Sequence, residues 1–592
     1  MRIDRLSAVK HGAVLKTDLA IVGGGPAGLT IAEQCARHGI AVLVIESGLE
    51  QQDHDHEALN EVQLGPCDRP AEWHGARTAF HAGLAELWSA ERQGYGVRCR
   101  GLGGSTQAWA GKSACFDPID YARRPWVEAS GWPVSPAELQ PFIRQAGDLL
   151  NLCPNEPSPR FAGTDLVSFY WQFSRSRVER LDVMRFGREL LARSPPGVDV
   201  LLDATVTRIA LAPDGTRVAS LDVANLAGRR ARVEAAHFVL AASAIENARL
   251  LLASNDVAPA GIGNPYDNVG RYMIDHLGAS LGAFEPQHVA RMARLFGFYG
   301  VPHNGKSHMF MHGLALAPEL QEREGLLNAA VYFAPQRAPD DPWDALKRLL
   351  KGRSSATARD IASVAKGSGT LVRGMGVKAL SAPQFPGVMK ELIVNSAIRL
   401  SPNMVAAEFS SGGLPHKLSG LSLEAVTEQE PQRDNRIALS PDRDRLGVPL
   451  PRADWRVGMK ERRTLLALAR RVGTGLASAD LPTPRFASWI ESKEPAAAGP
   501  IDLAHTMGTT RMSLHPRSGV VDRHCRVHGV ANLHIAGGSV LPTGGHANPT
   551  WMILAVACRL AARLRDEYFQ AEACSKPHRS SATAQLADPV VQ

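Results

Sequence analysis

The chain has 592 residues, of which 44% are hydrophobic and 21% charged, and its formal net charge is +7. This length exceeds what one hydrophobic core usually organises, so we expect two domains of a globular protein rather than a fibrous or disordered chain. The mild basicity comes without a stacking motif or a helix-turn-helix pattern, which speaks against nucleic-acid binding.

Positive charge is concentrated in residues 343–399, which hold ten Lys and Arg residues against three Asp and Glu. One interpretation is a surface for a membrane, an acidic partner or an anionic substrate. The other is a solvated basic insertion, which we favour because charge runs are usually solvated faces.

The eight cysteines are scattered and show no CxxC or Cys/His ligand spacing, so we expect reduced thiols and no metal site. No apolar run reaches the ~18 residues that a membrane span needs, and the N-terminus has no long apolar core. These features predict a cytoplasmic protein, with a peripheral membrane contact left open.

The first fifty residues carry a pattern for binding a dinucleotide. An apolar run at 19–22 leads into Gly23, Gly25 and Gly28, a helical pattern follows, and a second apolar run ends at Glu46. In such a βαβ unit the glycines permit a tight turn, close approach of a pyrophosphate and helix–strand packing. Glu46 is placed to bind both ribose hydroxyls. Its negative charge disfavours the 2′-phosphate of NADP. This segment alone does not decide between FAD and NAD.

A second glycine-rich stretch, residues 101–111, could run beneath a planar ring system, with an isolated turn as the alternative. Further along, patterns of strands, turns and helices alternate. We expect strands within 198–211, a hairpin turn at 213–216 before a strand at 218–223, a strand at 238–242, a helix at 245–254, a hairpin at 437–449 and a helix over 550–569.

The C-terminal part supplies candidates for chemistry. Asn548 and Pro549 are preferred residues for the start of a helix, and the apolar helix that follows predicts a buried N-terminus. The free amides of such an N-terminus need an electron-rich partner, such as the pyrimidine edge of a flavin. His505 precedes a turn of small residues and is a natural general base. His546 competes for that role.

Eight stretches resemble the glucose–methanol–choline (GMC) oxidoreductases, which are FAD enzymes acting on alcohols. Two of them, with the residues TTRM and NPT, are most similar to the pyranose-oxidase-like, bacterial sugar-oxidising branch. The stretches are DLAIVGGGPAG (18–28), VIESG (44–48), RGLGGSTQAWAGK (100–112), VLAASAIENARLLLAS (239–254), GNPYDNVGRYMIDH (263–276), HTMGTTRMS (505–513), GVVDRHCRVHGVANLHIAGGSVLPT (519–543) and NPT (548–550).

The resemblance implies that His505 is the catalytic histidine and that Asn548 stands where members carry a second His or an Asn. It places Trp109 and His546 near the substrate. A histidine that tethers FAD in some members is Ala108 here, which implies non-covalently bound FAD. The implied cofactor-binding residues are Gly23, Gly25, Pro26, Ala27, Gly28, Glu46, Ser47, Gly103, Gly104, Ser105, Val206, Ala242, Gly537, Asn548, Pro549 and Thr550.

The expected fold class is α/β, with an α+β second domain: a Rossmann-like FAD-binding domain of discontinuous segments with an inserted antiparallel-sheet substrate domain. The middle of the chain resembles the family only in patches, so it does not identify the substrate. The predicted segments are 1–130, 191–275 and 501–570 for FAD binding, 131–190 for a cap, 276–500 for the substrate domain with its basic insertion at 343–399, and 575–592 for a disordered tail.

The expected reaction is hydride transfer from a carbinol carbon to flavin N5, with His505 taking the hydroxyl proton and Asn548 hydrogen-bonding the same oxygen. A sugar, a polyol or an aminoglycoside-like alcohol is the expected substrate. A lyase-type flavoprotein of the same fold and a catalytically silent FAD-binding partner protein are the alternatives. The electron acceptor (oxygen, a quinone or a protein) and the oligomeric state are left open.

Overall fold

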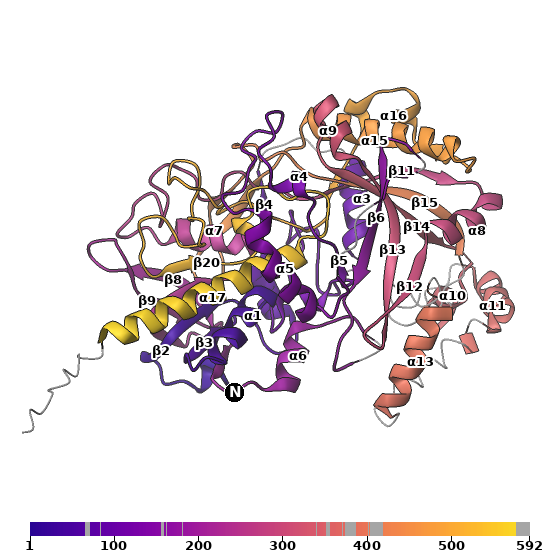
Figure 1. Ribbon diagram of the computed structural model, residues 1–592. Helices are drawn as coiled ribbons and strands as arrows, with labels where there is room; N and C mark the ends of the chain where they lie inside the picture. The colour runs from indigo at the N-terminus through magenta and orange to yellow at the C-terminus, as the bar shows by residue number, and fades with distance from the viewer. Residues whose placement is uncertain are drawn as a thin grey trace, which may run out of the picture.

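The computed structural model of the chain has two large sheets and a small third one (Figure 1). Residues 576–592 of the predicted tail at 575–592 and parts of the predicted basic insertion lie outside the described residues. The structure describes residues 1–575 except 66–70, 83–84, 155–158, 162, 180–181, 339, 351–355, 370, 373–385, 401 and 403–417.

The first sheet has a parallel part, as expected for a Rossmann-like domain, and a two-strand antiparallel extension. Its strands come from the start, the middle and the end of the chain, which agrees with the predicted discontinuous assembly. In spatial order they are β1 (Arg2–Arg5), β7 (Val198–Leu202), β3 (Val42–Ile45), β2 (Ala13–Val22), β10 (Arg230–Leu240), β9 (Val218–Ala224) and β8 (Thr205–Leu211), with β20 (Leu533–Ile535) also paired to β10.

Four helices lie beside this sheet or pack on a helix that does. Helix α1 (Pro26–Ala36) starts with a proline in its first turn after Gly25, a position where the missing N–H costs nothing. Helix α17 (Thr550–Ser575) packs against α1 and against α5 (Pro136–Leu149), and its N-terminal half is buried. Helix α7 (Ser243–Ala253) follows β10, as the sequence predicted.

The second sheet is antiparallel and largely built from the middle of the chain. Helix α15 (Met459–Ser478) covers one face, where Leu465, Leu468 and Val472 join the core. The opposite face contributes side chains to the cavity. The spatial order is β18 (Arg485–Phe486), β11 (Leu277–Phe284), β15 (Leu418–Thr427), β14 (Ala329–Arg337), β13 (Lys306–Leu316), β6 (Leu166–Phe173) and β5 (Lys112–Ser113), with β12 (Phe298–His303) paired to β13 and β19 (Ile501–Asp502) to β11.

The expected fold class is confirmed by these two sheets. The predicted hairpin at 437–449 forms β16 (Arg436–Arg443) and β17 (Pro449–Asp454), which pair with β4 (Gln63–Leu64) in a small third sheet. Residues 131–190, predicted as one cap segment, divide between the two sides: α5 packs on α17, whereas β6 belongs to the antiparallel sheet. The domain boundaries stay predictions.

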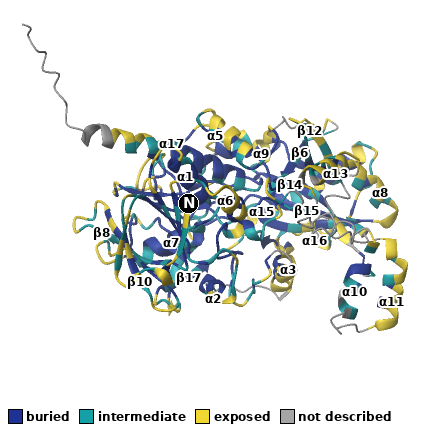
Figure 2. Cartoon of the chain, turned by 90° about the horizontal axis from the view of Figure 1, so that it is seen from below, coloured by how far each residue is buried: buried dark blue, intermediate teal, exposed yellow. Residues whose placement is uncertain are grey.

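The basic region contains three described helices at one end of the molecule (Figure 1). Helices α10 (Pro342–Leu350) and α11 (Thr357–Lys366) pack on each other and share the ion pair Arg348–Asp360, and both carry exposed residues (Figure 2). Helix α13 (Gly387–Leu400) lies against β12 and β13 and exposes several apolar side chains. No helix in the described part of the chain is long and apolar enough to cross a membrane.

The remaining helices connect these parts. They are α2 (His54–Glu57), α3 (Ala71–His81), α4 (Pro118–Tyr121), α6 (Phe186–Arg193), α8 (Pro286–Leu295), α9 (Pro318–Glu324) and α16 (Ser488–Glu491).

Candidate active site

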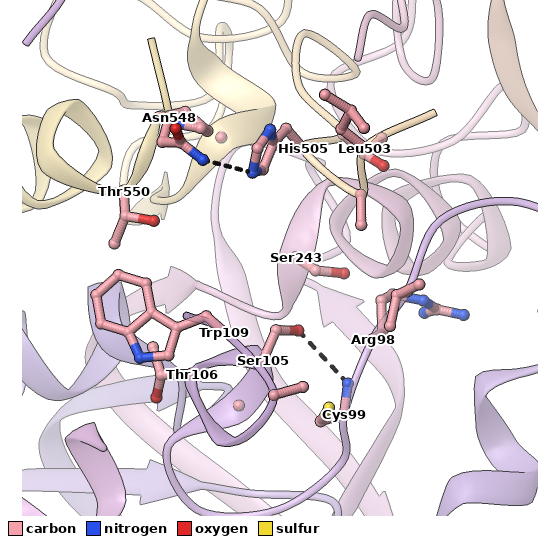
Figure 3. A pocket seen from close by; sticks show the side chains of 18 of the residues that line it. Arg98, Cys99, Ser105, Thr106, Trp109, Ser243, Leu503, His505, Asn548 and Thr550 are labelled. Carbon is pink, nitrogen blue, oxygen red and sulfur yellow. Dashed lines mark hydrogen bonds between the residues drawn. The ribbon is translucent and has the colours of Figure 1, made fainter. Parts of the chain in front are cut away.

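A cavity of about 920 Å³ extends from the dinucleotide loop to the antiparallel sheet. Figure 3 shows His505 and Asn548 on one side of it and Ser105, Thr106 and Trp109 on the other. Most of the predicted site residues line this cavity: Gly23, Gly25, Pro26, Ala27, Glu46, Ser47, Gly104, Ser105, Trp109, Val206, Ala242, His505, Gly537, Asn548, Pro549 and Thr550.

The nucleotide end has the features that a dinucleotide requires. A Cβ added at Gly25 would meet no atom within 4 Å, so the backbone at the start of α1 faces open space. The Glu46 carboxylate accepts the backbone N–H groups of Gly24 (2.7 Å) and Gly48 (2.9 Å). Burial raises the pKa of this carboxyl group. A buried acceptor beside an open helix N-terminus fits a ribose diol and a pyrophosphate.

Three predicted site residues do not line the cavity. Gly28 and Gly103 serve close packing instead, because a side chain at Gly28 would clash with the Gly23 carbonyl and one at Gly103 would come within 2.6 Å of the Gly187 nitrogen. His546 is buried against Phe169, with ring centroids 4.5 Å apart, and burial lowers its pKa to about 3. His546 is therefore a neutral residue of the adjoining core and not part of the cavity wall.

His505 and Asn548 meet at the catalytic end of the cavity. The Asn548 side-chain nitrogen lies 3.3 Å from His505 Nε2, as the dashed line in Figure 3 marks. Burial is the main cause of a His505 pKa well below its ordinary value, and the neighbouring His276 and Lys112 lower it further. The imidazole of His505 is therefore neutral at physiological pH.

The tautomer of His505 is fixed by His276, a residue to which the sequence assigned no role. His276 Nε2 lies 3.0 Å from the Gly544 carbonyl oxygen, which only accepts, so this nitrogen carries the proton. Burial lowers the pKa of His276 to about 4, so its Nδ1 is bare and accepts the proton on His505 Nδ1, 3.0 Å away. His505 Nε2 is then left with its lone pair directed at Asn548.

The backbone of His505 is held by the residue that precedes His276. Asp275 accepts the backbone N–H groups of His505 (2.9 Å) and Leu503 (3.2 Å) and the hydroxyl of Tyr95 (3.0 Å). Burial and the nearby Asp502 raise the pKa of Asp275 to about 7. The Asp275–His276 dipeptide thus fixes both the backbone and the ring of His505. It ends the stretch 263–276, so the family resemblance was the signal that could have found it.

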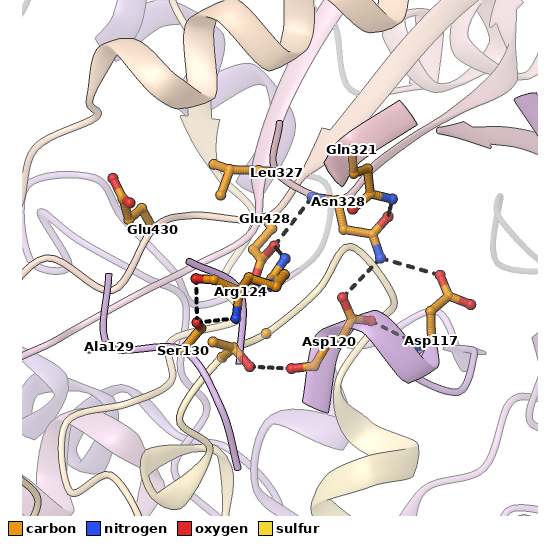
Figure 4. A network of polar contacts seen from close by, with 12 residues as sticks. Asp117, Asp120, Arg124, Ala129, Ser130, Gln321, Leu327, Asn328, Glu428 and Glu430 are labelled. Carbon is orange, nitrogen blue, oxygen red and sulfur yellow. Dashed lines mark hydrogen bonds and ion pairs between the residues drawn. The ribbon is translucent and has the colours of Figure 1, made fainter. Parts of the chain in front are cut away.

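A buried polar network supports the loop before Asn548 (Figure 4). Arg124 makes a two-pronged ion pair with Glu428 at 2.7 and 2.5 Å, and both side chains are almost fully buried. In the same network, the Asn328 amide donates to Asp120 at 2.9 Å. The Asp120 carbonyl accepts the hydroxyl of Thr543, one residue before the Gly544 carbonyl that orients His276.

Comparisons with known proteins agree with this architecture. Residues 431–557 match the family model described as GMC oxidoreductase, and residues 21–50 match an NAD(P)-binding Rossmann-like domain. A 2-methyl-1,2-propanediol dehydrogenase of Mycolicibacterium austroafricanum is 24% identical, over 92% of this chain and 94% of its own length. Paromamine 6'-oxidase of Streptomyces fradiae is also 24% identical, over 92% of this chain and 90% of its own.

A solved structure supports the fold. A fungal aryl-alcohol oxidase is similar with a TM-score of 0.54 at 15% sequence identity, over 93% of this chain and 99% of that chain. The chain is thus similar to the GMC oxidoreductases over residues 431–557 and to a Rossmann-like domain over residues 21–50, and its fold is similar to that of the aryl-alcohol oxidase.

Proposed function

We propose that this protein is an FAD-dependent enzyme that oxidises a CH–OH group, with His505 as the base and Asn548 as its polar partner. The observation that carries the proposal is the pair itself. A neutral imidazole with a bare Nε2 lies 3.3 Å from an amide, in a cavity that also holds the dinucleotide loop. A silent FAD-binding protein needs no base prepared in this way, whereas a lyase-type flavoprotein would be distinguished by conversion of its substrate without reduction of the flavin.

Each residue has a defined task in the proposed reaction. His505 Nε2 accepts the hydroxyl proton of the alcohol, and His276 keeps this nitrogen bare by accepting the proton on Nδ1. The Asn548 amide donates to the same substrate oxygen and orients the carbinol carbon. Bound FAD supplies the acceptor for the hydride. The N-terminus of α17, at Thr550, directs its free amides into the cavity.

We propose that FAD is bound without a covalent tether. Ala108 lines the cavity and offers no atom that could form such a bond. The thiol of Cys99 also lines it, but burial raises its pKa to about 12, which keeps it protonated and unreactive. Acid precipitation of the purified protein should therefore leave the yellow flavin in the supernatant. A yellow pellet would contradict this mode of binding.

For the substrate, the relatives favour the expected sugars, polyols and aminoglycosides. The printed names of two of them refer to a propanediol and to paromamine. The motifs at 505–513 and 548–550 favour the pyranose-oxidase-like branch. The basic region at 343–399 stays a proposal for an acidic partner or a membrane surface, and an electron acceptor that is a protein would be one such partner.

The experiment that tests the proposed function is anaerobic bleaching of the bound flavin. The purified protein is mixed without oxygen with a panel of sugars, polyols, aminoglycosides, aryl alcohols and hydroxy acids, and flavin absorbance is followed. We expect at least one alcohol to bleach the flavin and to yield the matching carbonyl compound. Conversion of a substrate without bleaching would favour the lyase, and no reaction with any compound would favour the silent protein.

A further inference from the structure

One positively charged side chain lies at the catalytic end of the cavity without an acidic partner. Lys112, on β5, lines the cavity together with His505 and Trp109. Its ammonium group lies 4.2 Å from the ring centroid of Trp171 and 3.9 Å from that of Tyr332. Burial lowers the pKa of Lys112 to about 7, and no carboxylate in the described part of the chain raises it again.

The acidic residues that line the cavity are all engaged elsewhere. Among the described lining residues they are Glu46, Glu246 and Asp444. Glu46 accepts two backbone amides of the dinucleotide loop. Glu246 and Asp444 both pair with Arg249, at 3.2 and 2.7 Å. The acidic residues at the nucleotide end are therefore paired with other groups there. Among the described residues that line the cavity, none supplies a counter-charge for Lys112, so a bound molecule could supply it.

The part of the cavity lining that comes from the antiparallel sheet and helix α8 is mainly apolar, and its polar side chains are those of Lys112, Tyr332 and Arg294. Its larger apolar side chains include Phe173, Phe298, Met311 and Val426, and Trp109 and Leu503 add to them from neighbouring segments.

We propose that the alcohol oxidised by this enzyme carries a carboxylate on an apolar aryl or alkyl body, and that Lys112 binds the carboxylate while the carbinol faces His505. The inference rests on the proposed oxidation of an alcohol and assigns it a substrate class other than the sugars, polyols and aminoglycosides that the relatives favour. A cation taken out of water is costly unless a counter-charge compensates it, and aromatic faces compensate only part of the cost. A single lysine matches one carboxylate, whereas phosphate recognition normally uses several donors.

The position of Lys112 also links substrate binding to the base. The charge of Lys112 is one of the causes that lower the pKa of His505 and of His276. A bound carboxylate would neutralise this charge and so raise the proton affinity of His505 at the moment when a hydroxyl proton must be accepted. A polycationic aminoglycoside would have the opposite effect and would meet no free carboxylate at this end.

Equilibrium binding tests the inference independently of turnover. Benzoate, phenylacetate and 3-phenylpropanoate are titrated calorimetrically into the FAD-loaded enzyme at pH 6.5, each beside its neutral carboxamide. We expect at least one carboxylate to bind about 10-fold or more tightly than its amide, as a charge-assisted hydrogen bond does. The preference should fall at pH 8.5, because Lys112 loses its proton as the pH rises through about 7.

Three variants assign the preference to one side chain. Lys112→Met should reduce the carboxylate-to-amide ratio about 10- to 100-fold, and Lys112→Arg should restore most of it. Arg294→Gln tests the exposed cation that also lines the cavity. Flavin content and melting temperature check that each variant is folded. The inference is overturned if the wild type shows no preference, if the preference survives in Lys112→Met, or if only Arg294→Gln removes it.

The bleaching assay separates this inference from the proposed function. If neutral alcohols bleach the flavin but carboxylates have no advantage in binding, the role of Lys112 fails and alcohol oxidation stands. If carboxylates bind through Lys112 but no alcohol bleaches the flavin, the oxidation fails and the anion site stands. If Lys112→Met slows only the reoxidation of the flavin by oxygen, Lys112 serves the electron acceptor and the inference is wrong.

Discussion

The two ends of the cavity are built in different ways. The nucleotide end uses backbone amides and glycines from one continuous βαβ segment, with Glu46 as its main side chain. The catalytic end brings together Lys112, His276, His505 and Asn548, which are far apart in the sequence and depend on buried polar contacts to meet. The first end depends on local geometry, and the second depends on the packing of the whole molecule.

This difference predicts that a mutation distant from the cavity can weaken the packing on which the catalytic end depends. Arg124→Ala leaves Glu428 buried without its ion-pair partner, and removing one partner of a buried pair costs about 3–5 kcal/mol. The free energy of unfolding, measured in urea, should fall by about this amount. The exposed neighbour Arg123 provides the matched control, Arg123→Ala, which should lose less than ~1 kcal/mol. If both variants lost the same free energy of unfolding, the polar network in Figure 4 would not stabilise the protein.

Replacing His276 tests whether the tautomer of His505 matters. His276→Leu removes the acceptor for the Nδ1 proton, so we expect flavin reduction to slow about 10²-fold, less than loss of the base itself. His276 also lowers the pKa of His505, so the acid limb of the pH–rate profile should move to higher pH in this variant.

The conservative variant His276→Gln retains an acceptor and should recover part of the rate. A slower rate with an unshifted pH profile would mean that His276 acts only in packing.

Replacing Gly25, at the nucleotide end, should affect binding of the cofactor and not folding. Gly25→Ala adds a Cβ where the structure has no atom within 4 Å, so the free protein should fold normally. The added methyl group enters the space meant for the pyrophosphate, and we expect FAD affinity to fall about 10-fold or more. Gly499→Ala, also in open surroundings, is the matched control. Unchanged FAD affinity in Gly25→Ala, measured by fluorescence titration, would contradict the placement of the cofactor.

The effect expected for His546 is small at neutral pH and concerns stability against acid. Its pKa in the folded state is about 3, so between pH 6.5 and 3 the unfolded chain binds a proton that the folded chain does not. Stability is therefore lost as the pH falls, by about 1.4 kcal/mol per pH unit for one such histidine. His546→Leu should remove this contribution, and His11→Leu, at an exposed site, should not. Parallel stability curves for His546→Leu and the wild type would contradict the neutral, buried state.

The sequence was sufficient for the local parts of the molecule. The strand–glycine–helix pattern predicted β2 and α1, and the glycine and N-cap rules predicted the residues at Gly25 and Asn548 that line the cavity. A charged turn sequence also predicted the hairpin of β16 and β17.

The catalytic end was less accessible from the sequence because its contacts are long-range. Nothing in the residues around His276 shows that its ring meets His505 across 229 positions of sequence. A long-range contact also explains why His546, predicted near the substrate, does not line the cavity. It is close to Asn548 in the sequence, but its ring packs in the core beside Phe169. The sequence also could not show that the acidic residues lining the cavity pair with groups other than Lys112, because these ion pairs depend on the folded structure.

The most direct test of the central claim is the rate of anaerobic flavin reduction in His505→Ala, measured by stopped flow with an alcohol that bleaches the wild type. His546→Leu, which changes a histidine outside the cavity, is the matched control. With His505 as the base, reduction should slow about 10²–10⁴-fold in His505→Ala at unchanged flavin content. Reduction of His505→Ala at the wild-type rate would contradict the assignment of His505 as the catalytic base.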